Sequence, residues 1–118
     1  MKDITYSDGQ YTGYSQSDYS AEPYWGIIRF NVKEGKIKNV NFMIRDSALH
    51  ETFNAEYAKH FAGNEEYIQQ TRNDWNGVNR YPKILERKQD ISKVDVITGA
   101  TWSHNIFKDS FIAALKKK

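Results

Sequence analysis

The stretch from Asp95 to Ser103, DVITGATWS, decides how the last third of this chain is organised. Residues 94–97, Val-Asp-Val-Ile, predict a strand or extended segment, and Gly99 with the small Ala100 predicts a turn directly after it. A helix is then expected from about His104 to Lys117. Its apolar face would consist of Ile106, Phe107, Ser110, Phe111, Ala114 and Leu115.

The turn in this stretch has the features of a phosphate site. A helix start presents unpaired backbone N–H groups and the positive end of the helix dipole, and Gly99 allows a ligand to approach the backbone closely. Three hydroxyl groups lie at the same junction, those of Thr98, Thr101 and Ser103. The alternative is an ordinary helix cap, with Ser103 or Thr101 as the N-cap residue. Because such junctions are common and most bind nothing, these residues alone favour the cap.

The first third of the chain predicts β-structure. Apolar residues alternate in YWGIIRFNV, and a KEGK turn with Gly35 separates this run from a second one. We expect an antiparallel hairpin of residues 25–33 and 36–44, because a glycine at that place supplies the positive φ of a tight turn. Tyr6 to Ser15 is expected to add another strand.

The middle third has a helical period. A helix is predicted from Ser47 to Phe61, started by Asp46 or Ser47. Glu65 to Thr71 is weakly helical. The Asn- and Gly-rich residues 73–82 predict a loop, and a short helix is expected from Pro82 to about Lys88. The apolar residues that carry the four-residue period are Leu49, Phe53, Tyr57 and Phe61.

Together these elements predict an α+β fold, an antiparallel β-sheet with packed helices, in which the final helix lies on the sheet. The length of 118 residues, with no repeat or linker, predicts a single domain spanning residues 1–118. Trp75 lies in the predicted loop, where it would either cover a ligand or anchor the loop to the core.

Composition excludes several classes of site. The chain has no cysteine, which excludes a disulfide framework, a thiolate nucleophile and cysteine-ligated metal. Its histidines, His50, His60 and His104, form no metal-binding pattern. The 17 Lys plus Arg against 15 Asp plus Glu give a net charge of +2, which provides no footprint for nucleic acid. No apolar run approaches the roughly 20 residues of a membrane helix, so no transmembrane segment is predicted.

Residues 95–101 also match the flavinylation pattern Dxx(S/T)GAT, and in this the chain resembles the FMN-binding domain family. That family includes domains of the sodium-translocating NADH:quinone oxidoreductase C subunit, of the Rnf complex G subunit, and of stand-alone extracytoplasmic electron carriers. The resemblance extends to the opening DGQYTGYS, the KEGKIKNV turn and the closing TGATWSHNIFKDSFIAAL. The chain departs from the family pattern where SAEPYWG replaces a glycine-rich stretch and where His104 replaces a small residue.

The resemblance implies that FMN is attached through its phosphate to Thr101 by a phosphoester bond. A separate magnesium-dependent flavin transferase, with FAD as donor, would make that bond. A tether on the phosphate leaves the isoalloxazine ring electronically untouched, so the protein would tune the ring by stacking and hydrogen bonds.

The other residues that the resemblance assigns to the cofactor surround Thr101. Asp95 would orient the loop or take part in recognition by the transferase. Trp102 and His104 would lie against the flavin or its phosphate, or would be ordinary packing and cap residues. Thr98, Gly99 and Ala100 would shape the loop. The predicted cofactor-binding set is Thr101, Thr98, Gly99, Ala100, Asp95, Trp102 and Ser103, and no catalytic or metal-binding residue is predicted.

These inferences predict an electron-transfer flavoprotein domain, and so small a chain favours a redox carrier over an enzyme with its own substrate. The expected partners are the flavin transferase and redox donor and acceptor proteins or small electron carriers. The expected location is extracytoplasmic and membrane-associated, with a leader absent from this chain, and a cytoplasmic location is the alternative. Two other functions stay open: a small flavin reductase or flavin store that holds FMN without a covalent bond, and a flavin-free binding or surface-antigen module.

Overall fold

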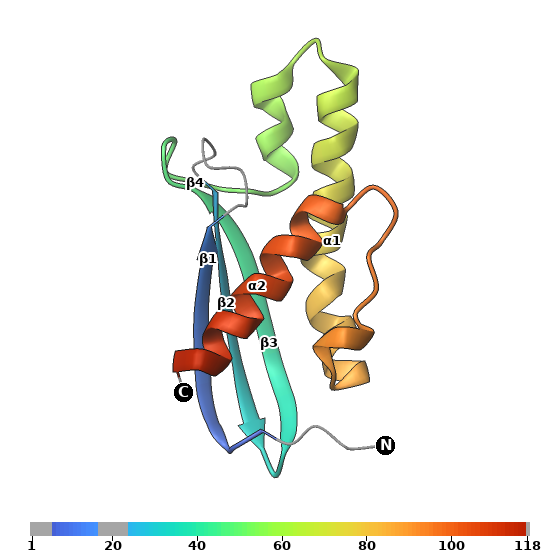
Figure 1. Cartoon of the computed structure of the whole chain (residues 1–118). Coiled ribbons are helices and arrows are strands. Elements are labelled where there is room, and N and C mark those ends of the chain that lie inside the picture. Colours follow the sequence, from blue (N-terminus) through green and yellow to red (C-terminus); the bar gives the residue numbers. More distant parts are fainter. Residues whose placement is uncertain (1–5, 17–23, 118) are drawn as a thin grey trace.

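The computed structural model describes residues 6–16 and 24–117, and in that part of the chain four strands form one antiparallel sheet (Figure 1). The strands are β1 (Gly9–Gln16), β2 (Tyr24–Lys33), β3 (Lys36–Asp46) and the short β4 (Glu51–Thr52), in the spatial order β1-β2-β3-β4. The helices of the same part are the 3-10 helices η1 (Ala55–Phe61) and η2 (Ile91–Lys93) and the α-helices α1 (Glu65–Lys88) and α2 (Thr101–Lys117). The predicted α+β fold, an antiparallel sheet with packed helices, is confirmed.

The β2–β3 hairpin forms where the sequence predicts it. Lys33 pairs with Lys36 across a two-residue turn, in which Glu34 and Gly35 have φ values of 55° and 76°. Positive φ at both positions gives a turn whose twist matches that of the strands. The backbone N–H of Gly35 also donates to the Asp8 carboxylate (3.1 Å), which joins the turn to the segment before β1. The hairpin and the additional strand β1 are both confirmed.

Helix α2 lies across one face of the sheet, and α1 packs beside α2 and against β3 (Figure 1). Side chains alternate along a strand, so every second residue of β2, including Ile28 and Phe30, is buried on this face. The Phe30 ring stacks on that of Phe111 of α2, with the ring centres 5.1 Å apart. The approach is closest at Gly13 of β1, where a Cβ atom would lie 2.1 Å from the Ser110 carbonyl oxygen. This packing brings the start of α2 against α1, and there the candidate site forms.

The helix predicted for residues 47–61 is wrong in its first half. The chain turns after Asp46 because Asp46 Oδ1 accepts the backbone N–H groups of Ala48 (2.9 Å) and Leu49 (3.1 Å). His50 then has a φ of 56°, and β4 follows before η1 begins. Asp46 therefore caps a turn rather than a helix, and Leu49 is exposed instead of lying on an apolar helix face.

The loop predicted for residues 73–82 is also wrong, because these residues lie inside α1, which is continuous from Glu65 to Lys88. Asn and Gly disfavour helices intrinsically, but tertiary packing overrides that preference here. A Cβ atom at Gly77 would lie 2.7 Å from the Ser103 Oγ, so the crossing of α1 and α2 requires a glycine at this point. Pro82 is buried within the same helix rather than starting a new one.

The segment before α2 differs from its prediction in two ways. Residues 94–97 are irregular rather than a strand, and they follow the short helix η2. Helix α2 begins at Thr101 rather than near His104. The first turn of α2 consequently contains Thr101, Trp102 and Ser103, three residues of the predicted cofactor-binding set.

Candidate functional site

The loop that precedes α2 is held by the buried Tyr81 of α1. The Tyr81 hydroxyl accepts the backbone N–H of Ile97 (3.0 Å) and donates to the backbone carbonyl of Ala100 (2.9 Å). Burial raises the pKa of Tyr81, so the hydroxyl keeps the proton that it donates. A ring nitrogen of His104 lies 2.6 Å from the Val94 carbonyl oxygen and fastens the beginning of the same loop. The loop is therefore fixed at both ends by side chains from outside it.

Gly99 lies where this loop approaches α1 most closely. Its φ of 81° is a conformation that residues with a Cβ atom rarely adopt. A Cβ atom there would also lie 2.6 Å from the Nδ2 of Asn73 on α1. The Gly99 carbonyl accepts a hydrogen bond from the Gln70 side chain of the same helix (2.9 Å). Backbone conformation and the contact with α1 thus both require glycine at this position.

The start of α2 is capped by Asp74, a residue of α1. Asp74 Oδ1 accepts the backbone N–H of Ser103 (3.0 Å) and its hydroxyl (2.8 Å), and Asp74 Oδ2 accepts from Gln70 (2.6 Å). Asp74 is 2 % exposed and Ser103 is fully buried. The alternative cap in the sequence, with Ser103 or Thr101 as N-cap, is therefore wrong, since both residues lie inside the helix. The Ser103 N–H is also occupied, so it is not a donor for a phosphate.

The predicted cofactor-binding residues differ in accessibility. Thr101, the first residue of α2, is exposed, as are Thr98 and Asp95 in the loop. Ala100 is buried beneath them, and Trp102 is half-buried. The structure thus presents one threonine hydroxyl at the helix start and places the next side chain, the Trp102 indole, toward the interior.

Trp102 forms part of the wall of an open cavity of about 260 Å³. The Trp102 ring meets Tyr24 and Phe53 edge-on, with ring centres 4.9 Å and 5.2 Å apart. Aromatic walls with a few polar groups are typical of small-molecule sites. The lining residues are Tyr24, Phe53, Tyr57, Phe61, Gln70, Thr71, Asp74 and Trp102.

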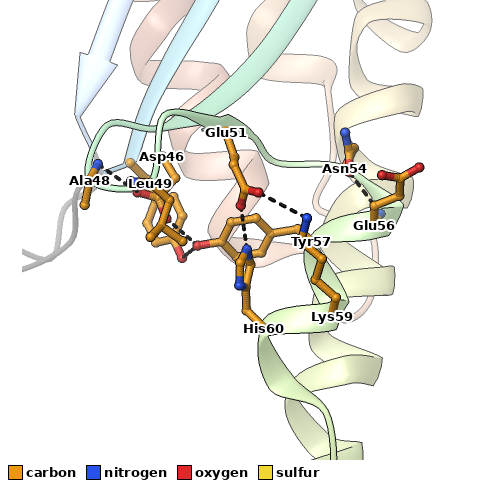
Figure 2. Close-up of polar contacts among 10 residues, drawn as sticks. Asp46, Ala48, Leu49, Glu51, Asn54, Glu56, Tyr57, Lys59 and His60 are labelled. Carbon is orange, nitrogen blue, oxygen red and sulfur yellow. Dashed lines mark hydrogen bonds and ion pairs between the residues drawn. The ribbon is translucent and has the colours of Figure 1, made fainter.

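The hydroxyl groups of Tyr24 and Tyr57, two residues that line the cavity, belong to a hydrogen-bond chain that ends at Asp46, and Figure 2 shows its Tyr57–Asp46 part. The Tyr57 hydroxyl donates to Asp46 Oδ2 (2.5 Å), and the Tyr24 hydroxyl lies 2.7 Å from the Tyr57 hydroxyl. Burial raises the pKa of Asp46, but the hydrogen bonds from Tyr57, Leu49 and Ala48 lower it by more, so the net pKa lies below its usual range. Burial and the hydrogen bond to Asp46 raise the pKa of Tyr57. Asp46 is therefore a carboxylate and Tyr57 a neutral phenol near neutral pH.

A second polar cluster in Figure 2 faces solvent. Glu51 contacts a ring nitrogen of His60 (2.5 Å) and the Lys59 ammonium (3.2 Å). The hydrogen bonds from His60 and Lys59 hold the pKa of Glu51 below its usual value. Within residues 6–16 and 24–117, no group of three or more His, Cys, Asp or Glu side chains is placed to hold a metal ion. No helix in that part of the chain has the length and apolar character needed to cross a membrane.

Sequence reasoning missed most of the cavity wall. The four-residue period of Phe53, Tyr57 and Phe61 was a usable signal, because all three side chains line the cavity, although only Tyr57 and Phe61 lie in a helix, the 3-10 helix η1, and Phe53 precedes it. Asp74 gave no local signal, since its role depends on the packing of α1 against α2. Trp75 lies in α1 and packs on a buried cluster next to the cavity, which corresponds to the anchoring interpretation.

Comparison with known proteins identifies a matching family and a similar structure. The family described as FMN-binding domain matches residues 21–116. The crystal structure of the CPE2226 protein from Clostridium perfringens is similar, with a TM-score of 0.62 and 26 % sequence identity over 97 % of this chain and 88 % of that one. A search of curated proteins gave no significant match.

Proposed function

We propose that this chain, which belongs to the FMN-binding domain family, is an electron-carrier domain that holds FMN through a phosphoester bond to Thr101. Membership of the family indicates FMN as the cofactor. When bound, FMN supplies the ability to accept and release electrons, and the protein supplies position and environment.

The observation that carries the proposal is the adjacency of Thr101 and Trp102 at the start of α2. Thr101 is exposed, so a modifying enzyme can reach its hydroxyl, while Trp102 lines the aromatic cavity. Thr101 is not among the lining residues, so a phosphate on it would be attached next to the cavity, at the neighbour in the chain of the Trp102 ring that lines it. The cavity volume of about 260 Å³ is just below the roughly 300–1,000 Å³ of typical ligand pockets. Its aromatic walls suit a flat ring system. The residues present therefore fit FMN.

The capping carboxylate favours a covalent bond over a purely ionic phosphate site. A free phosphate at a helix start is held by backbone N–H groups and by the helix dipole. In this chain Asp74 already accepts the Ser103 N–H, and its negative charge opposes a second anion nearby. A phosphoester bond to Thr101 needs no such donor, because the attachment is covalent.

The cavity also favours a carrier over an enzyme with its own substrate. Among the described residues that line it, Asp74 supplies the one carboxylate, and that group is engaged by Ser103 and Gln70. The other lining residues are aromatic rings, a threonine and a glutamine, which hold and orient a ring rather than move protons. The proposed partners are accordingly a flavin transferase and redox proteins or small electron carriers, and the proposed location, based on the resemblance alone, is extracytoplasmic.

The test is the intact mass of the protein after co-expression with a flavin transferase. The wild type and Thr98→Ser should gain one FMN less one water, and Thr101→Ala should gain nothing. Thr98→Ser is the matched control because it changes another exposed threonine of the same motif and keeps the hydroxyl that the pattern Dxx(S/T)GAT requires. A gain in Thr101→Ala would assign the bond elsewhere. No gain in any protein, with the transferase active on another substrate, would leave non-covalent FMN binding or a flavin-free module.

A further inference from the structure

Asp46 is a buried carboxylate at the end of β3, and each of its oxygens has a separate set of donors. Oδ1 accepts the backbone N–H groups of Ala48 and Leu49, and Oδ2 accepts the Tyr57 hydroxyl. The side chain is 2 % exposed. An ionised carboxylate is only an acceptor, so the Tyr57 proton must point toward Asp46.

This fixes the direction of the next hydrogen bond. A phenol has one proton, and that of Tyr57 is used toward Asp46. The contact of 2.7 Å between the Tyr57 and Tyr24 hydroxyls must therefore use the proton of Tyr24. The hydrogen bonds therefore run from Tyr24 to Tyr57 to Asp46, because each phenol has a single proton to donate. This chain is called here the tyrosine relay. Toward any third group, the Tyr24 oxygen acts as an acceptor.

Both tyrosines line the cavity, and Tyr24 lies against Trp102, the neighbour of Thr101 in the chain. We infer that Asp46 is a positioning residue for the flavin ring: through the tyrosine relay it makes the Tyr24 hydroxyl an acceptor for the ring N3–H. The oxidised isoalloxazine ring has this one N–H among several acceptor atoms. An acceptor in the wall thus selects the imide edge of the ring over its other edges. The inference rests on the proposed FMN site.

Asp46→Asn reverses the tyrosine relay while leaving the turn intact. The amide oxygen can still accept from Ala48 and Leu49, because both bonds use Oδ1. The amide nitrogen replaces Oδ2 and donates to Tyr57, so the Tyr57 proton turns to Tyr24 and the Tyr24 proton turns to the ligand. The Tyr24 O–H then faces the ring N3–H, so two donors meet and no hydrogen bond forms between them.

The experiment measures binding of free FMN by flavin fluorescence, with every variant made in the Thr101→Ala protein so that no covalent bond forms. Asp46→Asn and Tyr24→Phe should each weaken binding by about tenfold, the worth of one good hydrogen bond. Tyr14→Phe, on the outer face of the sheet, is the matched control and should bind as the Thr101→Ala protein does. Circular dichroism and thermal unfolding should show that Asp46→Asn stays folded.

A modified ligand separates this role from a structural one. FMN methylated at N3 lacks the N–H, so it should bind the Thr101→Ala protein about tenfold more weakly than FMN. Asp46→Asn and Tyr24→Phe should then discriminate little between the two ligands. Equal affinity of Asp46→Asn and its parent for FMN would overturn the inference. If the Thr101→Ala protein binds no free FMN, the cavity does not select the ring by its own contacts and the inference fails, whereas the mass gain on Thr101 is tested separately.

Discussion

The two α-helices of this protein start in different ways. Helix α1 is capped locally: Asn64, the residue before it, accepts the backbone N–H of Tyr67 with its own side chain (3.2 Å). Helix α2 is preceded by Ala100, which has no side-chain acceptor, and the N–H of Ser103 is met instead by Asp74 of α1. A local cap forms from sequence neighbours alone, whereas the second cap requires that α1 is already packed in place.

This difference makes the geometry of the motif a property of the whole fold. Gln70 and Tyr81 of α1 bind the carbonyl groups of Gly99 and Ala100, and Asp74 binds the helix start that follows. The orange loop in Figure 1 runs back along α1 before α2 begins. Thr101 is therefore presented by a rigid frame, which is what a transferase that must recognise one hydroxyl needs.

The largest expected effect is that of Asp74→Ala. It leaves the buried N–H of Ser103 without its acceptor and leaves the Ser103 hydroxyl only its longer bond to the Ala100 carbonyl (3.2 Å), so we expect a loss of about 2–3 kcal/mol in the free energy of unfolding, measured in urea. Flavinylation of Thr101 should fall as well, because the frame of the motif is lost. The control is Asp95→Ala, an exposed carboxylate of the same loop, which should change stability by less than about 0.5 kcal/mol. A small effect of Asp74→Ala would mean that α2 does not depend on α1 for its cap.

Asp46 provides the contrast to Asp74, because one of its oxygens binds N–H groups of its own turn, whereas Asp74 caps a different helix. Its pKa lies below the ordinary 3.8, so its contribution to stability is present above that pH and is lost as the pH falls through the lower folded pKa. The wild type should be more stable than Asp46→Asn by about 1 kcal/mol at neutral pH. That difference should shrink below about pH 4 in urea titrations. A difference that is constant from pH 7 to pH 3 would show that the charge of Asp46 does not matter.

The smallest expected effect is that of Asn64→Ala. The cap is exposed and its hydrogen bond to Tyr67 is long, so we expect a loss of about 0.5–1 kcal/mol. FMN attachment should be unchanged, because Asn64 does not contact the motif loop. Thermal unfolding and intact mass measure the two quantities. A loss as large as that of Asp74→Ala would remove the distinction between the two helix starts.

The same distinction explains which parts of the structure the sequence could predict. The hairpin was predictable because Glu34 and Gly35 specify a tight turn between alternating strands. The loop assigned to residues 73–82 was wrong because Gly77 is there to let α2 approach, a reason that lies outside α1.

The candidate site likewise contains residues that the sequence could predict and contacts that it could not. The motif residues from Asp95 to Thr101 were identified by their resemblance to a known pattern, and Thr101 is exposed at the helix start. The cap by Asp74 and the tyrosine relay that ends at Asp46 were not predicted, because each joins residues far apart in the sequence. No periodicity or local motif marks such pairs.

The central claim is that Thr101 carries FMN, and peptide mapping tests it most directly. Trypsin should release residues 94–108 from the co-expressed protein, a peptide that contains Thr98, Thr101 and Ser103. Fragmentation in a mass spectrometer should place the added mass of one FMN less one water on Thr101. The same mass on Thr98 or Ser103, or an unmodified peptide from a protein that has been exposed to an active transferase, would contradict the account.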